Sequence, residues 1–225
     1  MSTAVRGSPR QRERAYLRLR EMILVNRIPE GTRLSETQWS QQLGVNRMAL
    51  REALARLAGE GFVARGAKTG YYIPQLSETD LLEIRRTRLI LECGAIAEIA
   101  ATAAAVNATP LATLRRLLPL RRACDDLESF LKRGYHLGVA EADRRFHECL
   151  VEAAGNRTLA ALYRGAPLPL VRGELAGSEQ WRQAAERTVA AHRAIVQAMA
   201  HGRPAEAMRL LAQHLNVGGL PPLTD

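Results

Sequence analysis

Hydrophobic positions in the first third of the chain recur at the spacing of short amphipathic helices. Between Gln11 and Asn26 they fall three or four residues apart, which predicts a helix with one apolar face. A second helix is expected after Ser35, because a serine followed three residues later by Gln38 has the form of a capping box. Gly44 marks the expected end of this second helix.

A third helix is expected after a connection of only about two or three residues. Asn46 is suited to cap it, and Arg47 and Arg51, four residues apart, lie together near its N-terminal end. The apolar stripe of this helix consists of Leu50, Ala53, Leu54 and Leu57. Two short helices joined by such a tight turn are typical of a helix-turn-helix.

Strand-like residues at 62–65 and 71–73 flank the glycine-bounded loop 66–70, which predicts a β-hairpin directly after the third helix. A hairpin in this position is a wing, and residues 74–77 are expected to form a linker. All of the following sequence has helical periodicity. The expected helices cover 79–106, 110–132, 137–154, 157–172, 179–201 and 204–217.

These patterns predict a mainly α protein with two domains. The first is a winged helix-turn-helix with a small β-hairpin wing at residues 11–75, preceded by a basic disordered tail at residues 1–10. The second is an all-α antiparallel helical bundle at residues 76–218, followed by a tail at residues 219–225. A chain of 225 residues is long enough to give each domain its own core.

Positive charge is concentrated in the predicted winged domain. The formal net charge is +9, and residues 1–75 hold 13 lysines and arginines against 6 acidic residues. From residue 76 onward, 19 basic residues face 17 acidic ones, which leaves little excess. A basic excess confined to one domain predicts that this domain approaches the phosphates of nucleic acid.

Other sequence features narrow the class of protein. No apolar stretch has the length of a membrane span or a secretory signal core, so we expect a cytoplasmic protein without a membrane partner. Three cysteines, an odd number, are spread through helical patterns at Cys93, Cys124 and Cys149. This distribution favours reduced thiols over a disulfide framework.

Six residues are candidates for contacting DNA. Arg47 and Arg51 are suited to the major groove, where a guanidinium bonds guanine O6 and N7 or grips a phosphate. Asn46, Thr37 and Lys68 are candidates for phosphate contacts, and Gly70 allows the backbone to come close to the DNA. The alternative for the two arginines is an ordinary solvated helix face.

Four side chains of the helical domain are candidate metal ligands. Asp143 and His147, four residues apart, project from one face of a helix, while His192 and His214 lie on apolar faces of two later helices. If these groups converge, they suit a divalent cation. The alternative is that each histidine is a core residue with one hydrogen bond, and that Asp143 pairs with a neighbouring arginine.

Residues 12–75 resemble the winged-helix domain of GntR-family regulators. The resemblance rests on Pro29-Glu30-Gly31, Leu34-Ser35-Glu36, Leu43-Gly44-Val45-Asn46-Arg47-Met48-Ala49-Leu50-Arg51-Glu52-Ala53-Leu54, Leu57, Glu60-Gly61-Phe62-Val63 and Gly70. It implies operator binding through Arg47, Arg51 and the wing glycine Gly70. This chain has Asn-Arg-Met-Ala-Leu-Arg at 46–51, where the family usually has Ser-Arg-Thr-Pro-Val-Arg, and it has Thr37 where some members carry an arginine. These departures bear on the operator sequence.

Residues 79–217 resemble the FCD effector domain of the FadR subfamily of GntR proteins. The resemblance rests on Arg88, Leu91-Glu92, Ala142-Asp143-Arg144-Arg145-Phe146-His147, Ala154-Gly155-Asn156, Ala191-His192-Arg193-Ala194-Ile195-Val196, Gly202, Ala207 and His214. It implies a divalent ion, Zn or Ni first, held by one aspartate and three histidines. It also implies a small carboxylate effector with Arg88 at its acid end, although Arg88 could equally form a helix salt bridge with Glu92. Six expected helices favour the shorter, VanR-like variety.

The sequence therefore predicts a homodimeric regulator, expected to be a repressor, that binds a double-stranded DNA operator and senses a small molecule. One alternative is a metal-dependent hydrolase that uses the Asp and His residues, but Val151 stands where a zinc protease helix needs its second histidine. No other catalytic motif is apparent, so we expect no enzyme. The other alternative is an architectural DNA-binding protein without a sensing function.

Overall fold

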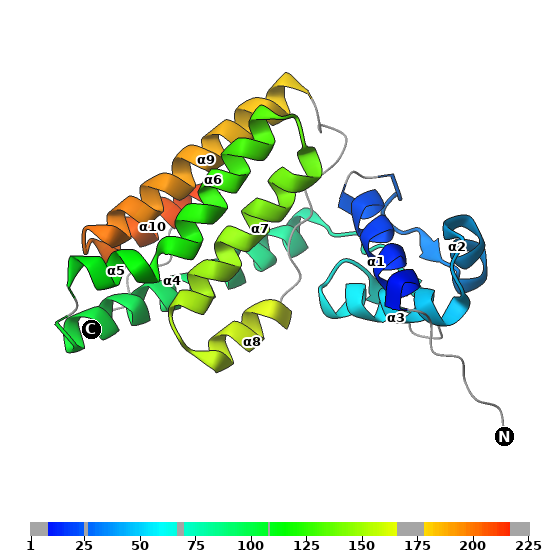
Figure 1. The fold of residues 1–225 in the computed structure, drawn as a ribbon, viewed down its shortest axis with the longest axis horizontal. Helices are drawn as coiled ribbons and strands as arrows, with labels where there is room; N and C mark the ends of the chain where they lie inside the picture. The colour runs from blue at the N-terminus through cyan, green and yellow to red at the C-terminus, as the bar shows by residue number, and fades with distance from the viewer. Residues whose placement is uncertain (1–8, 25–26, 67–69, 108, 166–177, 217–225) are drawn as a thin grey trace. The chain divides into compact units, whose positions relative to one another are not determined.

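The structure is a computed structural model that describes residues 9–24, 27–66, 70–107, 109–165 and 178–216. These residues form two compact units that meet in sequence between Ser77 and Glu78. We call them the winged unit and the helical unit (Figure 1). The mainly α fold class with a small antiparallel sheet is confirmed.

The winged unit contains three helices and three short strands. The helices are α1 (Pro9–Leu24), α2 (Glu36–Leu43) and α3 (Arg47–Gly59), and both α1 and α2 pack against α3. The strands are β1 (Arg33–Leu34), β2 (Ala64–Arg65) and β3 (Tyr71–Tyr72). The core contains Leu19, Leu34, Leu50, Leu54 and Leu57, each at most 1% exposed.

The sheet has the order β1-β3-β2, with both pairs antiparallel. Tyr71 lies opposite Leu34 on one side and Arg65 on the other. The predicted hairpin of β2 and β3 is therefore present, but β1 was not predicted. A strand of two residues has no periodicity that a sequence pattern could reveal.

Capping residues fix where the two helices of the helix-turn-helix begin and end. The Ser35 hydroxyl accepts from the Gln38 N–H at 3.4 Å, and α2 is capped at its C-terminus by Gly44, whose φ of 60° is left-handed. Asn46 Oδ1 accepts from the Ala49 N–H at 2.8 Å and so begins α3. Glycine adopts a left-handed φ without strain, which explains why the turn between the two helices is so short.

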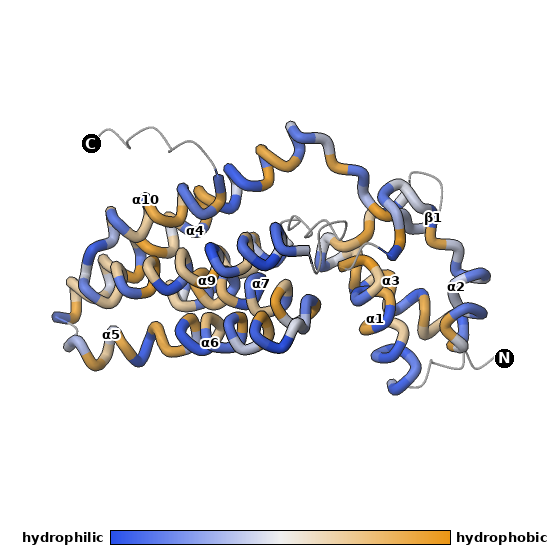
Figure 2. Tube along the Cα trace, turned by 90° about the horizontal axis from the view of Figure 1, so that it is seen from above, coloured by the Kyte–Doolittle hydropathy of each residue, from blue (hydrophilic) through white to orange (hydrophobic). Residues whose placement is uncertain are grey.

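The helical unit is a bundle of seven helices among the described residues. They are α4 (Glu78–Ala105), α5 (Pro110–Arg116), α6 (Leu118–Lys132), α7 (His136–Ala153), α8 (Arg157–Gly165), α9 (Glu179–Ala200) and α10 (Pro204–His214). Helix α6 packs against α7 and α9, α4 packs against α7 and α10, and α9 packs against α10. Hydrophobic and hydrophilic stretches alternate along these helices, as expected where one face of each is buried (Figure 2).

The prediction of a single helix at 110–132 is wrong, because the structure has α5 and α6 there, with Leu117 between them. Pro119 has no N–H and cannot continue the hydrogen-bond ladder of α5, so a new helix starts. The six expected helices thus become seven. Two other predicted boundaries also differ: α1 begins at Pro9, inside the expected tail, and residues 166–172 of the expected helix 157–172 lie outside the described residues.

Candidate DNA-binding surface and candidate metal centre

Arg47 and Arg51 both lie exposed on α3, as the sequence predicted for a DNA-reading face. Arg51 is also bound to Glu36, which is in the first turn of α2. Its Nε lies 3.0 and 3.1 Å from the two carboxylate oxygens, and its Nη2 lies 2.7 Å from Oε2. The Arg51 side chain nevertheless remains 57% exposed. A paired and exposed guanidinium is held in one orientation while it still faces solvent.

The other predicted DNA contacts have different surroundings. Asn46 serves as the cap of α3, and its Nδ2 also donates to Gln11 Oε1 of α1 at 2.8 Å. Thr37 is exposed on α2. Gly70 has a φ of 93°, and its carbonyl accepts from the Gly66 N–H at 3.0 Å. Lys68 lies outside the described residues.

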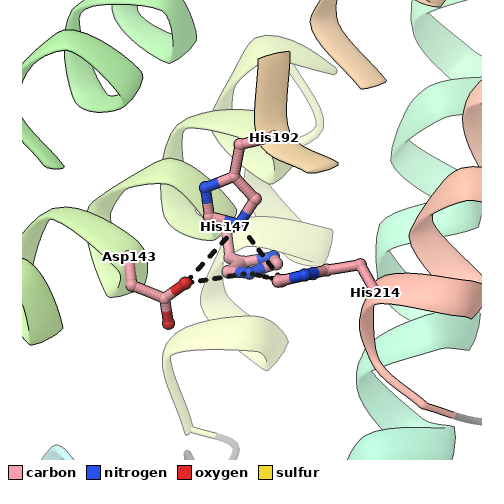
Figure 3. Close-up of side chains that lie close together, drawn as sticks. All are labelled: Asp143, His147, His192 and His214. Atoms are coloured by element: carbon pink, nitrogen blue, oxygen red, sulfur yellow. Dashed lines mark hydrogen bonds and ion pairs between the residues drawn. The ribbon is translucent and has the colours of Figure 1, made fainter. Parts of the chain in front are cut away.

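Asp143, His147, His192 and His214 converge at one point in the helical unit (Figure 3). Helix α7 supplies the first two, α9 the third and α10 the fourth, and the four ligand atoms all lie within 4.8 Å of one another. His214 Nε2 lies 3.1 Å from His192 Nε2 and 3.3 Å from His147 Nε2. Asp143 Oδ1 lies 3.5 Å from His192 Nε2 and 3.9 Å from His147 Nε2.

Burial keeps the three imidazoles of this cluster neutral. His147 is 1% exposed and His192 is fully buried, and burial lowers the pKa of both well below the usual value. The charge of Arg88 lowers the pKa of His147 further, and the neighbouring His147 lowers the pKa of His192. Burial also lowers the pKa of His214. Neutral imidazole is the form that ligates a metal.

The spacing of the four atoms suits a divalent cation. A tetrahedral ion about 2.0 to 2.1 Å from each nitrogen separates its ligands by roughly 3.4 Å. Four of the six separations are 3.1 to 3.9 Å, close to this value, and the other two are at most 4.8 Å. His214 Nε2 lies close to two other Nε2 atoms but can form a hydrogen bond with only one of them, so one of these two close nitrogen pairs has no hydrogen bond between its members. The residues present therefore fit a metal ion.

A buried carboxylate lies directly behind the cluster. Glu92 of α4 is fully buried, and its Oε2 lies 2.7 Å from His147 Nδ1. Its Oε1 accepts from Arg88 Nε at 3.1 Å and from the Tyr163 hydroxyl at 2.8 Å. Burial raises the pKa of Glu92, while Arg88 and the Tyr163 hydrogen bond act against that shift.

Arg88, the predicted effector contact, thus forms the salt bridge with Glu92 that the sequence left open as its alternative. Arg88 is only 8% exposed. Sequence reasoning did not identify Glu92 or Tyr163 as neighbours of the cluster. A buried glutamate is rare unless it is paired, and two of its three partners here lie 55 and 71 residues away, so no local pattern signals these two contacts.

Comparison with known families assigns both units. Residues 11–73 match the family described as bacterial regulatory proteins, gntR family, and residues 83–217 match the FCD domain. An uncharacterized HTH-type transcriptional regulator of Agrobacterium vitis is 36% identical over 140 residues, which cover 62% of this chain and 78% of that protein. A probable D-xylose utilization operon transcriptional repressor of Paenarthrobacter nicotinovorans is 28% identical over 195 residues, covering 86% and 80%.

Solved structures share the fold. E. coli McbR/YncC has a TM-score of 0.66 at 18% identity and covers 92% of this chain and 93% of its own. A putative GntR transcriptional regulator from Rhodococcus sp. RHA1 has a TM-score of 0.64 at 22% identity and covers 92% and 94%. Within the described residues, no helix is long and apolar enough to cross a membrane.

The prediction of a GntR-family transcription regulator is confirmed, and so is the expectation that the chain is not an enzyme. The two family matches follow one another along the chain, and their boundary falls at the start of α4, where the two units meet in sequence. This chain belongs to the GntR family of bacterial transcription regulators, with a gntR-type winged helix-turn-helix followed by an FCD domain.

Proposed function

We propose that this regulator is a homodimeric repressor whose affinity for its operator is controlled by a small carboxylate at a metal centre. The centre consists of Asp143, His147, His192 and His214, and the ions proposed to bind there are Zn and Ni. The observation that carries the proposal is the convergence of four ligand atoms from three helices within 4.8 Å. Three neutral imidazoles and one carboxylate are a donor set for a borderline-soft divalent ion.

A bound ion would supply positive charge and open coordination positions for the acid group of the effector. The side chain of Asp143 is 34% exposed, so the centre is accessible from that side, whereas His147 and His192 are enclosed. Arg88 remains the proposed contact for the acid group of the effector, although its Nε is already bound to Glu92, which offsets part of its charge. An anion is therefore attracted to the centre chiefly by the ion.

In the winged unit, Arg47 and Arg51 read the operator from α3. The proposed contacts to the sugar-phosphate backbone of the DNA are made by Asn46, Thr37, Lys68 and Gly70. Dimerised helical units set the distance between two recognition helices, which must match half-sites about one helical turn apart. The assignment as a repressor is supported by the Paenarthrobacter relative, whose name describes a transcriptional repressor.

Metal content tests the centre. Wild-type protein dialysed against stoichiometric Zn²⁺ or Ni²⁺ is expected to retain about one ion per chain by elemental analysis. His192→Ala removes one ligand and is expected to lose most of that ion. His201→Ala is the matched control, because His201 is an exposed residue at the end of the same helix. Wild-type protein without a bound ion would contradict the proposal.

Operator binding tests the coupling between the two units. An operator is first selected from random duplex DNA with the wild-type protein. Its affinity is then measured with acetate or citrate at saturating concentration, with and without Zn²⁺. An effector is expected to weaken binding by roughly 5- to 150-fold if it prefers a dimer whose recognition helices do not match the spacing of the half-sites. If none of a wide panel of small carboxylates changes the affinity, the coupling is absent.

A further inference from the structure

The carboxylate of Glu92 divides its two oxygens between different partners. Oε1 accepts from Arg88 Nε and from the Tyr163 hydroxyl, while Oε2 lies 2.7 Å from His147 Nδ1. These partners come from α4, α8 and α7, and Glu92 itself is fully buried. A carboxylate without access to water accepts hydrogens only from the donors that the fold provides.

We propose that Glu92 is a positioning residue for His147, which it holds in the tautomer that a metal ligand requires. A neutral imidazole carries one hydrogen, and Glu92, which is ionised beside the Arg88 guanidinium, draws that hydrogen to Nδ1 because an ionised Oε2 accepts and cannot donate. Nε2 is then left with its lone pair facing the other ligands of the cluster, His214 and Asp143. The inference rests on the proposed metal centre, whose ligand it orients.

Arg88 and Tyr163 support this arrangement from the other side of the carboxylate. Two donors on Oε1 fix the plane of the carboxylate, and the positive charge of Arg88 compensates the buried negative charge. Arg88 therefore acts as the counter-ion of Glu92. This role differs from the effector contact that its position in the sequence suggested.

His192 has a different environment, which makes the role of Glu92 specific to His147. The Nδ1 atom of His192 has no hydrogen-bond partner among the described residues. Its ring is instead stacked on Phe146, with centroids 3.7 Å apart and planes 7° from parallel. Ring stacking restrains orientation but does not choose between the two tautomers.

Substitution Glu92→Gln tests the proposal with almost no change in size. Arg88 Nε–H must still meet an acceptor at the former Oε1 position, so the amide oxygen stays there and the NH₂ group faces His147. His147 Nδ1 then becomes an acceptor, and its hydrogen moves to Nε2 inside the cluster. We expect this tautomer change in the nitrogen-15 NMR spectrum of the metal-free protein, with His147 assigned by comparison with His147→Asn.

Cation affinity is the second readout, measured for Zn²⁺ by competition with a chelator. Glu92→Gln is expected to weaken binding by about 10- to 100-fold, as is usual when the partner of a ligating histidine is lost. Glu98→Gln is the matched control, because Glu98 lies on the same helix and accepts from Asn156 Nδ2 at 3.0 Å, away from the cluster. The control is expected to keep the wild-type tautomer and its affinity within about twofold.

Two outcomes would overturn the proposal. The first is wild-type His147 with its hydrogen on Nε2 in the metal-free protein, a result that does not depend on any variant folding. The second is an unchanged tautomer and an unchanged Zn²⁺ affinity in Glu92→Gln. If wild-type protein binds no cation at all, the proposed function fails, but the tautomer of His147 still decides the role of Glu92.

Discussion

Arg51 is held by Glu36 through three short contacts, and this pair has consequences for DNA reading. A fixed guanidinium is expected to prefer one base edge, while the carboxylate beside it repels phosphate. We predict that Glu36→Gln lowers the ratio of operator affinity to random-DNA affinity about tenfold, within the usual 1 to 3 kcal/mol of one base contact. Affinity for random duplex DNA should rise.

Competition between operator and random DNA at several salt concentrations measures both effects. Glu52→Gln is the control, because Glu52 pairs with Arg12 Nη1 at 2.9 Å in the same unit without contacting Arg51. Arg47→Ala provides a reference for the loss of one proposed base contact. An unchanged affinity ratio in Glu36→Gln would show that Arg51 does not need its partner for specificity.

The cysteine side chains give a prediction about the reactivity of their thiols. Burial raises the pKa of Cys93 and of Cys124 to about 11, from an ordinary value near 9. A raised pKa means less thiolate at any given pH below it, here about 100-fold less at pH 8. Both thiols should react slowly with a disulfide reagent in native protein at pH 8 and rapidly after denaturation. A fast native reaction at Cys124 would contradict its burial.

At the residue scale, the sequence predicted the four candidate metal ligands but not the buried carboxylate that contacts one of them. Asp143 and His147 share a helix face because they are four residues apart, so their proximity follows from helix geometry. That His192 and His214 reach the same point depends on how α7, α9 and α10 pack, and only the family resemblance implied it. Glu92 was visible only as the partner of Arg88 at four residues' distance.

At the element scale, Asn46 combines a structural and a proposed functional role in α3. Its Oδ1 caps the helix, so Asn46→Ala should destabilise the winged unit by about 1 kcal/mol. Asn46→Asp keeps the capping oxygen and suits the positive end of the helix, so stability should be retained. Its added negative charge should still weaken operator binding.

Thermal unfolding and operator titration on both variants separate these roles. Stability lost in Asn46→Ala but kept in Asn46→Asp identifies the cap. Operator affinity lowered in Asn46→Asp, despite full stability, identifies a site close to phosphate. Operator affinity in Asn46→Asp equal to that of the wild type would instead leave the residue with its capping role alone.

Helix boundaries were predictable where a capping residue marks them. Asn46 and Gly44 placed the turn of the helix-turn-helix, because each of these residue types has a specific backbone preference. The break at Leu117 was missed although Pro119 follows it, because apolar periodicity continues through 110–132. Strand β1 depends on pairing with β3, a contact of the folded chain that no pattern around Leu34 contains.

At the scale of the whole molecule, two compact units should respond differently to a cation. All four candidate ligands belong to the helical unit, so only the unfolding of that unit is linked to binding. Zn²⁺ at 100 times its dissociation constant should stabilise the helical unit by about 2.7 kcal/mol. The winged unit should unfold at the same temperature with and without Zn²⁺.

Calorimetry with Zn²⁺ and with a chelator checks this prediction, and Asp143→Asn provides the comparison. The variant should show a smaller shift, because it replaces the anionic ligand with a neutral amide. A Zn²⁺-dependent shift of both transitions by the same amount would mean that the two units unfold together. No shift in either transition would argue against the metal centre.

The ligands and the carboxylate that supports them are widely separated in sequence, since His147 and His214 lie 67 residues apart and Glu92 lies 55 residues before His147. An unfolded chain would have to close long loops to gather them, at an entropic cost that grows with loop length. Only the neighbours Asp143 and His147 could meet in a locally helical fragment. Any ion held by all four ligands thus shows that α7, α9 and α10 have already packed together, and occupancy serves as a readout of correct assembly.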